Sequence, residues 1–190
     1  PVYFVSVIVF IVPVYLLLSV ARSHNVEYLN GIFEMKYNLP IFISQPYIYI
    51  ANNYDNLDTL IKELPKHSFG LKGLFPLWAL TGIKFIYPKI VDFPIFVNKT
   101  ELTTVTLFYD AFYDFGIAGV ALFSTGLGCI GYFFEKMIRS TRHAVFYMIY
   151  AQWFVYLALS FFTTWFSNPA TWFYFIVTAV IFFICEQRGR

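Results

Sequence analysis

The sequence has little charge for its length. Asp, Glu, Lys and Arg make up 13% of its 190 residues, whereas a soluble domain usually carries about a quarter. Apolar residues account for 59% and aromatic residues for 23%, and the mean hydropathy is +0.64. This balance excludes an ordinary soluble domain and predicts an integral membrane protein, with the lipid bilayer as its surroundings.

Basic runs, paired cysteines and an initiator Met are also missing. A net charge of +2 without a basic cluster argues against nucleic acid as a partner. Cys129 and Cys185 both fall in apolar runs, so we expect neither a disulfide nor a metal site. The chain begins at Pro1 inside an apolar run that no basic segment precedes. We therefore expect no signal peptide, and we interpret the sequence as the C-terminal part of a larger membrane protein.

Four apolar segments approach the length of about 20 residues that a membrane-spanning helix needs. We expect an all-α integral membrane fold with transmembrane helices over 1–20, 115–134, 144–166 and 171–185. The second helix has an outer extension, so that the whole element covers 104–134. The residues Ser-Asn-Pro-Ala at 167–170 predict a tight hairpin, because Pro169 cannot continue the preceding helix.

Basic residues in the short connections predict the orientation. The loop 135–143 and the tail 186–190 hold five of them, which places both on the cytoplasmic side: Lys136, Arg139, Arg142, Arg188 and Arg190. The hairpin and the long segment 21–103 then lie outside the cytoplasm. Prolines interrupt the apolar runs of this long loop, so we expect short interfacial or re-entrant helices in it. A small packed extracytoplasmic domain is the alternative.

Two aspartates stand at the outer end of the second predicted span. Asp110 and Asp114 are four residues apart and therefore share one face of a helix. Small residues continue that face, which predicts close packing against another helix: Ala118, Ala121, Thr125 and Gly128. In the alternative interpretation, the two carboxylates are simply solvated, or they favour the positive end of the helix.

The run TLFYDAFYDFGIAGV at 106–120 resembles a late segment of the bacterial O-antigen polymerases, which polymerise oligosaccharide repeat units. Members of this family carry a threonine, an aromatic stretch, then Asp-Phe-Gly and a further glycine. The matching positions are Thr106, Phe108, Tyr109, Tyr113, Asp114, Phe115, Gly116 and Gly119. The upstream runs SVARSHN and QPYIYIANNYDNLDTLI resemble the family's arginine at a span end and its tyrosine-rich segment.

This resemblance implies a glycosyltransferase-type enzyme of the bacterial cytoplasmic membrane. It would join oligosaccharide repeat units carried on undecaprenyl diphosphate, at the outer face, for O-antigen, capsule or exopolysaccharide synthesis. The implied partners are the lipid-linked oligosaccharide, a chain-length regulator and a flippase. Neither a cofactor nor a metal is implied, because cationic side chains can neutralise the departing diphosphate.

The resemblance also suggests roles for individual residues. Asp114, Asp110 and His67 are candidates for accepting the proton of the acceptor hydroxyl. Arg22 suits a diphosphate, because its guanidinium makes bidentate contacts, although an interfacial arginine that only snorkels is equally consistent. The remaining substrate-binding candidates are His24, Lys66, Lys72, Tyr47, Tyr49, Tyr109 and Tyr113. Asp114 could instead pair with an arginine and fix its helix, and Lys66 and Lys72 could be ordinary loop charges.

Three other functions compete with the polymerase. A lipid-linked glycan ligase shares the same diphosphate chemistry, and a structural subunit of a membrane complex needs none of it. A transporter or flippase for lipid-linked oligosaccharides predicts polar residues along a path through the bilayer. The predicted spans hold few such residues, chiefly Gln152, with Thr163 and Thr164 nearer the outside. The scarcity of polar residues in the spans favours the enzyme.

Overall fold

The computed structural model describes residues 13–14, 31–37, 39–141, 144–161 and 163–188, and every regular element longer than two residues in them is a helix. The α-helices and 3-10 helices (η) are α3 (Ile41–Glu63), α4 (Phe75–Leu80), α5 (Ile83–Ile86), η1 (Pro88–Ile90), α6 (Phe108–Thr141), α7 (Ala144–Ala158), η2 (Trp165–Ser167) and α8 (Pro169–Arg188). The expected all-α class is therefore confirmed for these residues. The predicted span 1–20 lies almost wholly outside them.

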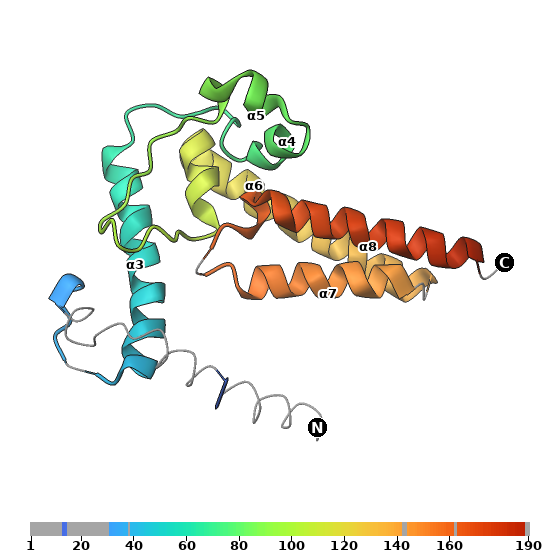
Figure 1. Ribbon diagram of the computed structural model, residues 1–190, viewed down its shortest axis with the longest axis horizontal. Helices are drawn as coiled ribbons and strands as arrows, with labels where there is room; N and C mark the ends of the chain where they lie inside the picture. The colour runs from blue at the N-terminus through green and yellow to red at the C-terminus, as the bar shows by residue number, and fades with distance from the viewer. Residues whose placement is uncertain (1–12, 15–30, 38, 142–143, 162, 189–190) are drawn as a thin grey trace.

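The helices α6, α7 and α8 run side by side and form the main body of the protein (Figure 1). Leu127, Trp153 and Phe166 are buried where α6 and α7 meet the turn before α8. A hydrogen bond of 2.6 Å from Gln152 Nε2 to Thr178 Oγ1 joins α7 to α8. The short helix α4 packs against α8 and η2, with α5 next to it, and α3 runs across the end of the bundle at which α6 begins (Figure 1).

One helix is long and apolar enough to cross a membrane, namely α6, judged by its length and composition. In its most apolar stretch 11% of the residues are buried, whereas the core helix of a soluble protein is mostly buried. The apolar helices α7 and α8 (to Cys185) are shorter. The described residues thus contain one helix that is long and apolar enough to cross a membrane, and the four-span arrangement stays a prediction.

Several boundaries differ from those predicted. The helix α6 continues through most of the expected loop 135–143. The helix α7 ends at Ala158 instead of continuing to 166, so the connection before α8 is wider than the expected hairpin at 167–170. Pro169 begins α8, a position where its missing N–H costs no hydrogen bond.

The segment 21–103 contains a longer helix than we expected. The helix α3 has 23 residues and includes Pro46, which removes only one backbone hydrogen bond near the start. Two of the three buried asparagines of α3 hold the extended chain that leads into α6. Asn52 donates to the Leu102 carbonyl at 2.9 Å, and Asn56 donates to the Thr104 carbonyl at 2.8 Å. Asn53 donates to the Phe161 carbonyl at 3.2 Å, which ties α3 to the turn after α7.

Candidate functional site

The two aspartates of the Asp-Phe-Gly helix lie at a break in α6. Phe115 and Gly116 leave helical geometry there, and Gly116 has φ 62° and ψ −146°. This backbone region is almost restricted to glycine. The break divides α6 into a short outer part, which carries both aspartates, and a long apolar part. It also ends the helix face that Asp110 and Asp114 share, so the small residues expected to continue this face are exposed: Ala118, Ala121, Thr125 and Gly128.

Asp114 is buried and fully hydrogen-bonded by a loop about forty residues upstream. Its Oδ1 atom accepts hydrogen bonds from the Ser68 hydroxyl and, at 3.1 Å, from the Lys72 backbone N–H. Its Oδ2 atom accepts from the Gly73 backbone N–H at 2.7 Å. Hydrogen bonds to an ionised carboxylate are about twice as strong as neutral ones. Asp114 therefore holds the loop 67–73 against the outer part of α6.

The same loop satisfies backbone carbonyls that the break exposes. A carbonyl near an interrupted helix loses the N–H four residues ahead of it. The Ser68 N–H donates to the Tyr113 carbonyl at 3.2 Å, and the Phe69 N–H donates to the Asp114 carbonyl at 3.1 Å. In all of these hydrogen bonds the loop donates, and the backbone or the Asp114 carboxylate of α6 accepts. Phe69 has a left-handed φ of 51°, which is strained for a residue with a side chain and is kept by these contacts.

Two further glycines allow this close fit. A Cβ atom on Gly73 would lie 2.7 Å from Asp114 Oδ2. A Cβ atom on Gly119 would collide with the Ala111 carbonyl oxygen and would lie 2.9 Å from Phe115 Cβ. The Asp-Phe-Gly motif and its following glycine therefore have a structural explanation, because together they build the break and anchor the loop to it.

Asp110 lies one helical turn above Asp114, beside the largely buried ammonium group of Lys72. The Lys72 Nζ atom is 3.8 Å from Asp110 Oδ1, and the two side chains are 16% and 11% exposed. The ammonium also faces the rings of Tyr113, at 4.7 Å, and Tyr109, at 5.7 Å. The hydroxyl groups of Thr164 and Ser167, in the turn before α8, also neighbour the Asp110 carboxyl group.

The site formed by His67, Lys72, Asp110 and Asp114, hereafter the acidic cluster, holds more carboxyl groups than ammonium groups, and burial raises the pKa of Asp110. Two carboxylates and one ammonium sum to −1 when all three are ionised. Asp114 is stabilised by three hydrogen-bond donors, and Asp110 by a single ion pair and hydroxyl neighbours. Such an arrangement favours a positive charge that develops nearby and disfavours a second anion.

His67 completes the acidic cluster. Its Nδ1 atom lies 3.2 Å from the Tyr113 carbonyl oxygen. A carbonyl oxygen only accepts hydrogen bonds, so this contact needs the proton on Nδ1 and leaves the lone pair of the neutral ring on Nε2. The ring lies edge-on to Phe112, and its Cε1 and Nε2 atoms lie beside Gly116. His67 thus presents a basic nitrogen next to the break in α6.

The other predicted residues lie elsewhere or in different roles. Lys66 is exposed beside His67. Tyr47 and Tyr49 lie in α3, more than three turns from the end that leads to the loop. Tyr109 and Tyr113 lie at the acidic cluster, but 1% and 3% exposure leaves no ring face for a sugar. The Tyr109 hydroxyl is already bonded to the Phe96 backbone N–H and carbonyl, each at 2.8 Å. Arg22 and His24 lie outside the described residues.

Ser68 and Gly73 hold Asp114, and the asparagines of α3 hold the chain before α6 and the turn after α7; sequence reasoning missed both sets. The two glycines of the run KHSFGLKG were a signal of close backbone approach. Three asparagines within five residues of one helix were a signal of buried backbone contacts. Among the described residues, no group of three or more His, Cys, Asp or Glu side chains is arranged to hold a metal ion.

Comparison of the chain with protein families, with curated proteins and with solved structures finds no match. The functional argument therefore depends on the geometry of the acidic cluster and on the chemistry of its residues.

Proposed function

We propose that this chain is the C-terminal part of a polytopic bacterial membrane enzyme that polymerises oligosaccharide repeat units linked to undecaprenyl diphosphate. One observation carries the proposal. The loop that carries His67 and Lys72 meets the helix that carries Asp110 and Asp114, although 38 to 47 positions separate these residues in the sequence. Lys72 pairs with Asp110, and His67 contacts the backbone carbonyl of Tyr113. Loop and helix meet at the end of the longest apolar helix, next to the Asp-Phe-Gly motif that resembles the polymerases.

The proposed topology puts the acidic cluster at the outer face of the cytoplasmic membrane. The apolar part of α6, the helices α7 and α8, and the segment 1–20 cross the bilayer, and the C-terminus is cytoplasmic. Large apolar side chains support this arrangement, because Ile117 is 81% exposed and Leu122 is 71% exposed. Contiguous apolar surface of this kind is costly in water and favourable in lipid.

The chemistry of the acidic cluster suits the transfer step at the anomeric carbon of the donor sugar. The acceptor hydroxyl oxygen forms a bond to the anomeric carbon of the donor, while the bond from that carbon to the diphosphate oxygen breaks. The hydroxyl proton passes to His67 Nε2, and the bonding electron pair leaves with the diphosphate. Positive charge develops at the anomeric carbon in such a transition state. The net negative charge of the acidic cluster stabilises it.

The remaining residues have supporting roles. Asp114 positions the loop that carries His67, because all three of its hydrogen bonds are made within the protein. Lys72 offsets part of the cost of burying the Asp110 carboxylate, although burial still raises the pKa of this group above its ordinary value. The diphosphate, which a negatively charged site disfavours, binds to other cations, for which Arg22 and the exposed Lys66 are the candidates.

Complementation of a strain that lacks its own polymerase tests this proposal. We expect His67→Gln and Asp110→Asn in the full-length protein to leave only single capped repeat units on a gel, at unchanged membrane levels. Asp58→Asn is the matched control, since Asp58 is an exposed carboxylate that pairs with Lys62 on α3, and it should give a wild-type ladder.

Two other results would overturn the proposal. Wild-type ladders from both cluster variants would remove the acidic cluster from catalysis. If even single capped units are missing in the strain without the protein, the function is that of a ligase or a flippase.

A further inference from the structure

One side of α3 carries a row of apolar residues that are mostly exposed. They follow one another at spacings of four, three, four, three and four, which places them on one side of the helix, and we call them the α3 stripe: Ile43, Tyr47, Ile50, Tyr54, Leu57 and Ile61. Each of them except Leu57 is between 41% and 56% exposed. The buried residues of α3 lie on the other side and include Ser44, Ile48, Asn52 and Asn56.

The spacing of the α3 stripe is the one by which two helices pack along their length. Apolar residues that alternate between three and four positions apart form the seam of a coiled coil. A contiguous apolar surface that stays exposed marks an interaction site. The α3 stripe covers 18 positions from Ile43 to Ile61, or about 27 Å of helix, which is long enough to hold a second helix.

The charge of α3 favours a protein partner over a lipid surface. The helix holds three carboxylates and one ammonium group, so its net charge is −2, and the residues are Asp55, Asp58, Lys62 and Glu63. Helices that lie on a membrane surface are instead rich in Lys and Arg, which anionic lipids attract. Anionic lipids repel a helix with the net charge of α3.

The positions of these charges favour a second copy of α3 that runs in the opposite direction. All four charges lie after residue 54, and residues 41–54 hold none. The N-terminal end of α3 has neither a capping side chain nor an acidic residue in its first turn, although carboxylates stabilise the positive end of a helix. In an antiparallel pair, the acidic half of each copy lies beside the uncharged half and the positive end of the other. A parallel pair brings the two acidic halves together.

The sizes of the side chains also match in the antiparallel direction. With a two-fold axis midway along the α3 stripe, each tyrosine faces an aliphatic side chain of the other copy, and the facing residues are Ile43 and Ile61, Tyr47 and Leu57, and Ile50 and Tyr54. A parallel pair in register places tyrosine against tyrosine in two layers. The α3 stripe is therefore complementary to itself when one copy is reversed.

Two copies in the same membrane meet in this direction. Figure 1 shows α3 running across the bundle of α6, α7 and α8. In the proposed topology this bundle crosses the bilayer, so α3 lies along the membrane surface. Most homodimers have a two-fold axis, and an axis along the membrane normal reverses the direction of a helix that lies along the surface. Such an axis relates two copies of α3 as an antiparallel pair.

We propose that the α3 stripe is a dimer interface, in which α3 packs antiparallel against α3 of a second copy of this chain. The interface lies on the side of α3 opposite the asparagines that hold the chain before α6, so the dimer leaves those hydrogen bonds intact. The inference takes only the topology from the proposed function.

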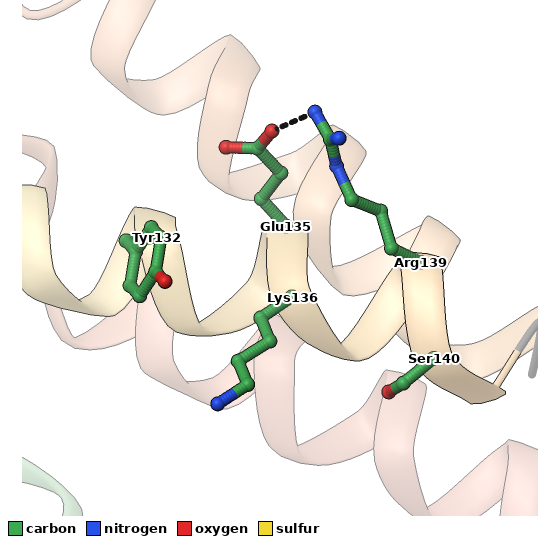
Figure 2. Close-up of a pocket in the computed structure, with 5 residues that line it drawn as sticks. All are labelled: Tyr132, Glu135, Lys136, Arg139 and Ser140. Carbon is green, nitrogen blue, oxygen red and sulfur yellow. Dashed lines mark hydrogen bonds and ion pairs between the residues drawn. The ribbon is translucent and has the colours of Figure 1, made fainter.

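The other end of the molecule provides a control residue. A cavity of about 460 Å³ lies over the last turns of α6, and its lining residues are Tyr132, Glu135, Lys136, Arg139 and Ser140. Figure 2 shows that Glu135 pairs with Arg139 there, so this surface is charged and carries no apolar stripe. Tyr132 is 68% exposed and Tyr54 is 55% exposed. The two tyrosines are similar in exposure, but only Tyr54 belongs to the proposed interface.

Analytical ultracentrifugation of the purified full-length protein in detergent tests the proposal. We expect the wild type to form a dimer. Tyr54→Ser should raise the Kd of the dimer about tenfold or more, because both copies lose a ring that the interface buries. Tyr132→Ser should dimerise as the wild type does.

Cysteine cross-linking in membranes tests the direction of the pair. Cys129 and Cys185 are both exposed, so the experiment starts from a variant in which serine replaces them. Two differently tagged copies, one with Ile43→Cys and one with Ile61→Cys, should be joined by a short bifunctional thiol reagent. Ile43→Cys alone should not be joined to itself, because the two positions lie about 27 Å apart along an antiparallel pair.

Three results would overturn the proposal. A wild type that stays monomeric in detergent and in lipid nanodiscs would show that lipid or another part of the chain covers the α3 stripe. A dimer that Tyr54→Ser leaves unchanged would place the contact elsewhere, and Ile43→Cys joined to itself would exclude the antiparallel direction. None of these measurements uses a glycan substrate. Polymer ladders from a monomer would refute only the dimer, and a dimer without ladders would refute only the polymerase.

Discussion

Asp114 Oδ2 accepts the backbone N–H of Gly73 at 2.7 Å, and the same oxygen occupies the space in which a side chain at position 73 would begin. This one contact therefore gives Asp114 a hydrogen bond and also explains why position 73 is a glycine. Asp114 and Gly73 lie 41 positions apart in the sequence, and each depends on the other.

Gly73→Ala should destabilise the protein by about 1–3 kcal/mol, because the added methyl group forces the Asp114 carboxylate out of its place. Thermal unfolding of the purified protein in detergent measures this change. Gly126→Ala is the control with the opposite sign, since its Cβ atom meets open space and alanine favours a helix interior by about 0.5–1 kcal/mol. An unchanged midpoint for Gly73→Ala would mean that the loop is not fixed by Asp114.

Gly116→Ala should release the loop 67–73 from α6. The backbone conformation at this position costs a residue with a side chain about 1–3 kcal/mol, and a continuous helix would withdraw the carbonyls that the loop now uses. Limited trypsin digestion followed by mass analysis should then show cleavage after Lys72, which is buried in the intact site.

Gly82→Ala is the comparison for that experiment. Gly82 also has a positive φ, of 76°, but lies beyond α4 and contacts neither aspartate. It should leave Lys72 protected. Cleavage after Lys72 at the same rate in both variants would contradict a specific role of the break in holding the loop.

Lys72 and Asp110 should show strong coupling in a double-mutant cycle. Lys72→Met leaves a poorly solvated carboxylate without its counter-ion, a loss of about 3 kcal/mol. Adding Asp110→Asn removes the unpaired charge, so the double variant should be more stable than Lys72→Met alone. Unfolding midpoints of all four proteins give the coupling, and additive effects would show that the 3.8 Å contact contributes nothing.

The sequence predicted the helical class, because it follows from hydropathy and from local spacing. The depth of the aspartate pair in a membrane stays a prediction. The sequence also raised a structural role for Asp114 as one alternative. The actual hydrogen-bond partners of Asp114 could not be predicted. They are a serine hydroxyl and two backbone N–H groups of a distant loop, and none of these groups carries a charge that a sequence pattern would show. The pairing of Asp110 with Lys72 was equally hidden, because a lysine in a loop is usually solvated.

The prediction that small residues continue the helix face of Asp110 and Asp114 was wrong for a different reason. Spacing arguments assume that a helix continues, and Gly116 ends the shared face two residues after Asp114. Gly116 itself was visible in the sequence, but glycine in an apolar helix more often permits packing than causes a break. The helix α3 was missed because Pro46 was interpreted as an interruption, although it removes only one bond near the helix start.

The break at Gly116 divides α6 into an outer part that the loop 67–73 holds and a long apolar part that the loop does not contact. The loop 67–73 fastens the outer part, so the acidic cluster moves with the loop and not with the apolar part. In the proposed topology only the apolar part lies in the bilayer, so a change in bilayer thickness would act on α6 below the acidic cluster. The spacing of His67, Lys72 and the two carboxylates would then stay the same in membranes of different composition.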